Sequence, residues 1–119
     1  MNGNTKKIWI TGASTGIGKA LAIKFANSGW EVAVSARREN LLNTLSEENS
    51  NIHSFPLDVT DKEKTKIVFQ NILEKFNDLD ICVFGTGIHD PESEKKLNSE
   101  TFRKIMDINF FGTLNCVFA

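Results

Sequence analysis

The sequence predicts an α/β fold in which a parallel sheet carries helices on both faces. A short apolar run at residues 8–10 stops in a glycine-spaced turn, and a helical pattern follows it directly. Further strand-like runs alternate with helical patterns, and the run at residues 81–84 is apolar without alternation, as in a parallel strand covered on both faces. With 119 residues, the chain has room for one domain at most.

The first strand, the turn and the helix together predict an anion-binding site. Gly12, Gly16 and Gly18 are positions where backbone can approach a ligand without a Cβ in the way. The apolar face of the following helix is marked by Ile17, Ala20, Leu21 and Phe25. The first N–H groups of a helix have no partner within it and carry partial positive charge. We therefore expect the turn to hold an anion, and a pyrophosphate fits best.

The second predicted strand covers residues 31–36, and its end bears on the choice of cofactor. Ser28 and Gly29 are typical of the end of the preceding helix. In dinucleotide-binding folds, an acid about 20 residues beyond the turn binds the ribose 2′-hydroxyl, whereas an arginine accommodates the 2′-phosphate of NADP. That position falls near Ala36, before Arg37 and Arg38, which favours NADP. The alternative is that both arginines are a solvated pair opening the next helix.

The middle of the chain predicts a helix at residues 39–48, with Leu41, Leu42 and Leu45 on its apolar side. Residues 51–61 then lead from a third short strand into a turn, in which Asp58 can hydrogen-bond its own backbone. His53 has no second ligand at metal-binding spacing, so we interpret it as an ordinary strand residue.

The next helix is predicted from a capping box. Thr60 and Glu63 have the required spacing, and the apolar side follows at Phe69, Ile72, Leu73 and Phe76. The unalternating run from Ile81 to Phe84 predicts a fourth strand that lies centrally, beside the first.

The last segment predicts a helix that begins at Ser99 and continues to the final residues. Asn109 lies on the apolar stripe of this helix, seven residues after Phe102. A polar amide on an inward face costs about 1–3 kcal/mol unless it is partnered. We expect Asn109 to hydrogen-bond a group of the site, or else to be satisfied by its own helix or nearby backbone.

Composition argues against several kinds of partner. The net charge is −1 and the lysines are scattered, so neither nucleic acid nor an anionic membrane is expected to bind. No apolar run approaches the roughly 20 residues of a membrane span, and the polar start MNGNTKK is unlike a signal peptide, so we expect a cytoplasmic protein. Cys82 and Cys116 are interpreted as small buried hydrophobes, with no metal.

The segment from Thr11 to Gly18, TGASTGIG, resembles the N-terminal signature of the short-chain dehydrogenase/reductase family. The resemblance runs through the whole chain and implies an incomplete Rossmann sheet, the first half, of order 3-2-1-4. It also implies an NAD(P)-dependent oxidoreductase that transfers hydride between the cofactor and a small carbonyl or alcohol substrate, with a homo-oligomer as the full-length state. Because of Arg37 and Arg38, we expect NADP as the cofactor, with NAD less favoured.

The same resemblance assigns roles to individual residues. The pyrophosphate turn would comprise Gly12, Ser14, Thr15, Gly16, Ile17 and Gly18. Asp58 would accept a hydrogen bond from the adenine amine, and Val59 would cover the ring. Asn109 would be the catalytic-site residue, holding a water in a proton relay to a catalytic lysine.

The sequence departs from the family after the fourth strand. The resemblance calls for Asn-Asn-Ala-Gly there, but Phe84, Gly85, Thr86 and Gly87 stand in its place, and only Gly87 matches. Gly85, Thr86 and Gly87 would still let backbone lie close to the adenosine ribose. The bracing amides are absent, so a catalytically silent dinucleotide-binding or sensor module is the alternative function.

The catalytic tyrosine and lysine that the resemblance implies are not in this chain, which contains no tyrosine. The last residues also lie within an apolar helical pattern that has no cap. We therefore expect residues 1–119 to be the N-terminal part of a single NAD(P)-binding Rossmann domain, truncated before the catalytic segment.

Overall fold

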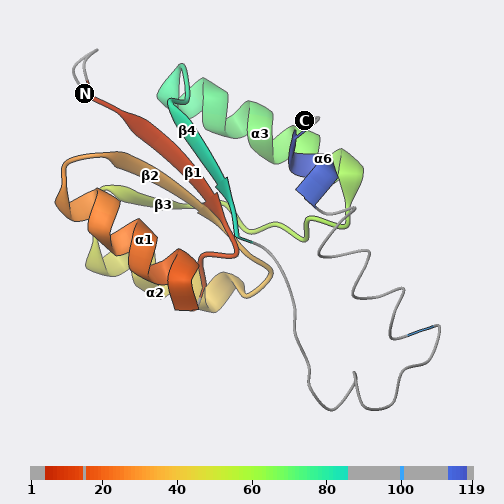
Figure 1. Ribbon diagram of the computed structural model, residues 1–119, viewed down its shortest axis with the longest axis horizontal. Helices are drawn as coiled ribbons and strands as arrows, with labels where there is room; N and C mark the ends of the chain where they lie inside the picture. The colour runs from red at the N-terminus through yellow and green to blue at the C-terminus, as the bar shows by residue number, and fades with distance from the viewer. Residues whose placement is uncertain (1–4, 15, 86–99, 101–112, 118–119) are drawn as a thin grey trace.

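The computed structural model describes residues 5–14, 16–85, 100 and 113–117 (Figure 1). Strands and helices alternate along the chain. Their bounds are β1 Lys7–Thr11, α1 Gly16–Asn27, β2 Glu31–Ser35, α2 Glu39–Glu48, β3 Ile52–Ser54, α3 Lys62–Phe76, β4 Ile81–Phe84 and α6 Thr113–Val117. The predicted α/β alternation is confirmed.

The four described strands form one parallel sheet of order β3-β2-β1-β4. In its register, Thr11 at the end of β1 lies beside Ser35 of β2 and Phe84 of β4. The predicted strand order 3-2-1-4 is therefore confirmed. The parallel register also brings the carboxyl ends of β1, β2 and β4 to one edge of the sheet.

The helices cover both faces of the sheet, as Figure 1 shows, with α1 and α2 on one side and α3 and α6 on the other. Alternate residues of β1 divide between the two layers. Ile8 and Ile10 pack in the cluster formed with α1 and α2, whereas Trp9 packs in the cluster formed with α3 and α6. This period of two is what a central strand with two covered faces requires.

The face of α1 that lies against the sheet consists of small residues, not of the larger apolar residues that the sequence pattern indicates. Its fully buried positions are Gly18, Ala22 and Ala26, whereas Ile17 is 81% exposed and Ala20 is also exposed. The prediction that Ile17 and Ala20 face the sheet is wrong. Small side chains are needed on the inner face because the helix starts directly against the β1 turn.

Helix α3 begins one residue later than a capping box at Thr60 would place it. Asp61 is the N-cap, and its carboxylate accepts a hydrogen bond from the Lys64 N–H at 3.0 Å. Thr60 is instead engaged by Asp58, whose Oδ1 accepts both the Thr60 N–H and its hydroxyl. The predicted Thr60–Glu63 capping box is therefore wrong, because the Thr60 hydroxyl and N–H both donate to Asp58 instead.

Strand β4 lies beside β1 as expected, but it is the outer strand among the described residues. Ile81 is 42% exposed and Cys82 is exposed as well, so the predictions that this strand is central and covered, and that Cys82 is buried, are wrong. Cys116, on α6, is buried as predicted.

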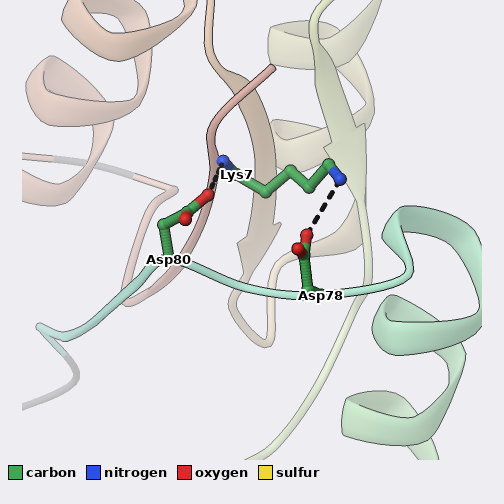
Figure 2. Close-up of polar contacts among 3 residues, drawn as sticks. All are labelled: Lys7, Asp78 and Asp80. Atoms are coloured by element: carbon green, nitrogen blue, oxygen red, sulfur yellow. Dashed lines mark hydrogen bonds and ion pairs between the residues drawn. The ribbon is translucent and has the colours of Figure 1, made fainter. Parts of the chain in front are cut away.

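Polar side chains fasten the amino end of the sheet. The Lys7 ammonium, on a side chain only 5% exposed, pairs with Asp78 Oδ1 at 2.9 Å, and the Asp80 carboxylate accepts the Lys7 backbone N–H at 2.8 Å (Figure 2). The Asp80 N–H in turn donates to the Lys7 carbonyl. Both carboxylates come from the segment between α3 and β4, so these bonds hold β4 in register with β1.

Within the described residues, no helix is both long enough and apolar enough to cross a membrane.

Candidate functional site

Three connections leave the sheet at the carboxyl edge, where ligands bind in open α/β sheets. The first runs from Thr11 into α1, the second from Ser35 into α2, and the third begins after Phe84. The connection that follows β3 joins them there, since the Leu57 N–H donates to the Ala36 carbonyl at 3.0 Å. The sheet thus gathers most of the predicted cofactor-binding residues at one edge.

The β1–α1 turn needs glycine for two different reasons. Gly12 and Gly16 have φ of 70° and 61°, which L side chains rarely adopt. At Gly18 the constraint is space, because a Cβ would collide with the Gly12 carbonyl oxygen and lie 2.9 Å from its carbonyl carbon. These glycines let the chain reverse tightly from β1 into α1 and leave the start of the helix uncovered.

The start of α1 offers its backbone to solvent. Gly16 and Ile17 are exposed, and a Cβ on Gly16 would meet nothing within 4 Å. The first N–H groups of a helix lack intrahelical acceptors and attract anions. Ser14 is half-buried in the same turn, and Thr15 lies outside the described residues. This geometry suits a phosphate group.

The end of β2 carries positive charge and no carboxylate. Arg37 and Arg38 are exposed, and among the described residues neither forms an ion pair. Arg38 precedes α2 but gives it no side-chain hydrogen bond as a cap. Both guanidinium groups are therefore available to an anionic ligand at this edge.

Asp58 lies near Arg37 in the turn after β3. Partial burial raises the pKa of its carboxyl, but the hydrogen bonds from Thr60 and the Arg37 charge outweigh this effect and hold it below its ordinary value. Asp58 is thus ionised at neutral pH and already acts as the turn residue that the sequence allowed. Oδ1 receives both Thr60 hydrogen bonds. The adenine role remains a prediction.

Val59 lies inside the protein and is only 4% exposed. It packs with Trp9, Val68 and other residues of the α3 layer, and its carbonyl accepts a hydrogen bond from Asn115 Nδ2 at 2.9 Å. Its predicted place over an adenine ring is not tested by these contacts. The Asn115 bond ties α6 to the turn that carries Asp58.

Gly85 lies tightly against β1 at the start of the third connection. Its N–H donates to the Thr11 carbonyl at 3.1 Å, and a Cβ on it would lie 2.9 Å from the same oxygen. Glycine is therefore required there by the fold itself. Thr86, Gly87 and the proposed catalytic-site residue Asn109 lie outside the described residues.

Two buried polar groups beneath the edge were not anticipated from the sequence. The Trp9 indole N–H donates to Ser35 Oγ at 2.9 Å, and the Thr11 hydroxyl, also buried, has no hydrogen-bond partner within the described part of the chain. A tryptophan in a buried strand needs an acceptor. Ser35, at an inward position of the neighbouring strand, could have been identified by that need.

The described ranges contain no group of three or more His, Cys, Asp or Glu side chains that could hold a metal ion. His53 pairs with Glu31 at 2.6 Å near the amino end of the sheet. Although Cys82 is exposed as a residue, partial desolvation of its thiol raises the pKa of that group. Burial, together with repulsion from a Cys82 thiolate, raises the pKa of Cys116 to about 11. Both thiols are neutral at physiological pH, which disfavours thiolate chemistry.

Comparisons with known proteins agree with this geometry. A profile of the short chain dehydrogenases matches residues 6–119. Serine 3-dehydrogenase of Rhizobium radiobacter is 34% identical over 110 residues, which cover 91% of this chain and 44% of the relative. The chain spans 34% of the length of the mouse dehydrogenase/reductase SDR family member 7 and 48% of that of a 3-oxoacyl-[acyl-carrier-protein] reductase of Staphylococcus aureus.

Solved structures show the same architecture. "ElxO with NADP Bound" has a TM-score of 0.83 and 30% identity, covering 95% of this chain and 48% of that one. A 3-ketoacyl-(acyl-carrier-protein) reductase from Brucella melitensis, complexed with NADH, has a TM-score of 0.85 and 26% identity, covering 94% and 47%. Relatives of this fold thus include proteins with either nicotinamide cofactor bound.

Proposed function

Because this chain belongs to the short-chain dehydrogenase family, we propose that it holds the adenosine and pyrophosphate part of NADP at the carboxyl edge of its sheet. The full protein would transfer hydride between this cofactor and a small carbonyl or alcohol substrate, and it would self-associate. A nicotinamide cofactor supplies the hydride, and the protein supplies placement and proton transfer.

The single observation that carries the choice of NADP is the end of β2. Two exposed arginines stand there, and within the described residues neither is engaged in an ion pair. A guanidinium offers a planar fork of donors that matches a phosphate, whereas a carboxylate at this place would repel one. Ala36 lies where an NAD-binding protein would carry an acid, and its apolar side chain offers no acceptor for a ribose hydroxyl.

The residues of the edge fit the other parts of the cofactor. The exposed start of α1 suits the pyrophosphate, because the first backbone N–H groups of a helix carry partial positive charge. Gly16 has no side chain, so a phosphate group has room to approach these N–H groups. Asp58 Oδ1 is used by Thr60, which leaves the second carboxylate oxygen to accept from an adenine amine. Asn109 would hold a water for proton transfer, and Gly85, Thr86 and Gly87 would lie along the ribose.

Titration of the chain with NADPH and with NADH tests this proposal. Arg37→Ala should raise the Kd for NADPH by about tenfold or more, as expected for the loss of a charge-assisted contact, with little change for NADH. Isothermal calorimetry gives both constants. Lys66→Ala is the matched control, since it removes one positive charge from an exposed position on α3.

Equal losses for the two cofactors in Arg37→Ala would contradict the assignment of NADP. Binding of neither cofactor by the unaltered chain would contradict the proposed site as a whole.

A further inference from the structure

Ser35 is a buried polar residue that joins three parts of the cofactor edge. It is 1% exposed, and its hydroxyl accepts the Trp9 indole N–H at 2.9 Å. Its carbonyl accepts the Ala13 N–H at 3.3 Å, so the same residue also holds the glycine turn. Arg37 follows it by two residues.

Trp9 gives Ser35 a rigid support. The indole is fully buried, and its ring packs edge-on against Phe84 at a centroid distance of 6.0 Å. It also packs against Phe69 in a tilted arrangement at 5.8 Å. Phe84 precedes Gly85, whose N–H is bonded to Thr11. The orientation of the indole N–H is therefore fixed by the packing of β4 and α3, and it aims at one acceptor.

The chain between Ser35 and Arg37 has little freedom. Ala36 is held through its carbonyl by the Leu57 N–H at 3.0 Å, in the connection that leads to Asp58. With Ser35 tied to Ala13 and Trp9, and Ala36 tied to Leu57, the position of the Arg37 backbone relative to the glycine turn is set by these bonds. A shift of Ser35 would change that separation.

We propose that Ser35, held by Trp9, is a positioning residue that sets the preference for NADPH over NADH. This inference rests on the proposed function. The pyrophosphate and the 2′-phosphate belong to one small nucleotide, so they can be gripped together only if the turn and the arginine are correctly spaced. Preorganised spacing strengthens binding because no ordering remains to be done when the ligand arrives. NADH lacks the 2′-phosphate, so its affinity depends less on the spacing between the glycine turn and Arg37.

The test measures Kd for NADPH and for NADH by calorimetry in four chains. Ser35→Ala removes the acceptor, and Trp9→Phe removes the donor while keeping an aromatic ring. Thr65→Val is the matched control, because Thr65 is also fully buried and its hydroxyl donates a hydrogen bond to the carbonyl of Asp61, the N-cap of α3. The unaltered chain is the fourth, and each melting temperature is recorded.

The Kd for NADH divided by the Kd for NADPH should fall about tenfold in Ser35→Ala and in Trp9→Phe, because a misaligned charge-assisted contact weakens NADPH binding more than NADH binding. This ratio should stay unchanged in Thr65→Val, even where the melting temperature falls as much. A purely structural role would leave the ratio unchanged, with the affinities for both cofactors reduced equally or only the melting temperature lowered, and that result overturns the inference. If Ser35→Ala does not fold, Trp9→Phe still decides.

The two hypotheses fail differently. An unaltered chain that shows no preference for NADPH contradicts the proposed function and, with it, this inference. A chain that prefers NADPH, with a ratio insensitive to Ser35 and Trp9, contradicts only the positioning role.

Discussion

At the amino end of the sheet, polar and charged side chains pair with one another, whereas at the carboxyl end the two arginines face solvent. Lys7 is paired with Asp78, and His53 with Glu31, each within 3 Å. Arg37 and Arg38, at the other end, form no ion pair within the described ranges. The same strands therefore use polar groups at one end to fix their register and present them at the other end to a ligand.

Turn residues with positive φ occur at both ends of the sheet, but they lead to different surroundings. Gly12 and Gly16 adopt positive φ at the carboxyl edge. The corresponding turn at the amino end, after α3, is made by Asn77 with φ of 71° and leads straight into the two aspartates that bind Lys7. The glycine turn leads to the exposed first residues of α1, whereas the asparagine turn leads to carboxylates that bind Lys7 of β1.

The largest loss of stability is expected at Gly18, where α1 lies directly against the Gly12 carbonyl. Gly18→Ala places a methyl group against the Gly12 carbonyl, and neither backbone segment can yield easily. We expect a loss of about 3 kcal/mol or more in the free energy of unfolding, measured by urea denaturation, together with loss of NADPH binding.

Gly16→Ala is the matched control for that substitution. It has open space but positive φ, so strain alone should cost about 1–2 kcal/mol. Equal losses for the two variants would show that α1 can move away from the turn, and the close approach at Gly18 would then not matter.

A smaller effect is expected at the amino end. Asp78→Ala leaves the buried Lys7 ammonium without its acceptor, but Asp78 itself is 69% exposed, and solvent screening should keep the loss to about 1 kcal/mol. Cofactor affinity should not change, which is the reverse of the pattern for Arg37→Ala. Calorimetric melting and NADPH titration provide the two readouts.

The double variant Lys7→Met/Asp78→Ala should recover most of that stability, because neither partner then remains unpaired. A weakened affinity for NADPH in Asp78→Ala would contradict the claim that the amino end of the sheet serves stability and only the carboxyl end serves cofactor binding.

The smallest effect concerns Asp58. Because the folded state holds the pKa of this carboxyl below its ordinary value, its ionised form adds stability above about pH 4. That contribution disappears as the pH falls through the lowered pKa. Asp58→Asn should remove this part of the acid dependence, seen in the free energy of unfolding between about pH 5 and 2. An unchanged pH profile would contradict the lowered pKa of Asp58, which the Thr60 hydrogen bonds and, to a smaller extent, the Arg37 charge produce.

Sequence periodicity was sufficient to locate the strands, because the centres of buried parallel strands such as β1 and β2 are short apolar runs. The strand order was predicted from the family resemblance, since periodicity does not specify which strands are neighbours. It was insufficient for α1, where Gly18 rather than Ile17 faces the sheet. Apolar spacing identifies a stripe, but the close approach of the helix selects small residues for its inner face.

The cofactor edge was predicted where motifs fix backbone geometry, and missed where contacts join distant strands. The glycine turn follows from the spacing of Gly12, Gly16 and Gly18. The Trp9–Ser35 bond spans 26 residues, and it depends on strand pairing that local patterns do not specify. The same holds for Lys7 and its aspartates, more than 70 residues away.

The most direct test of the account compares backbone amide chemical shifts of the ¹⁵N-labelled chain with and without NADPH. The account predicts large changes at Gly16, Ile17 and Arg37, around the turn and the end of β2, with Lys7 and Asp80 unaffected. Changes centred on the amino end of the sheet, or amides of the glycine turn that do not respond to a saturating cofactor, would contradict it.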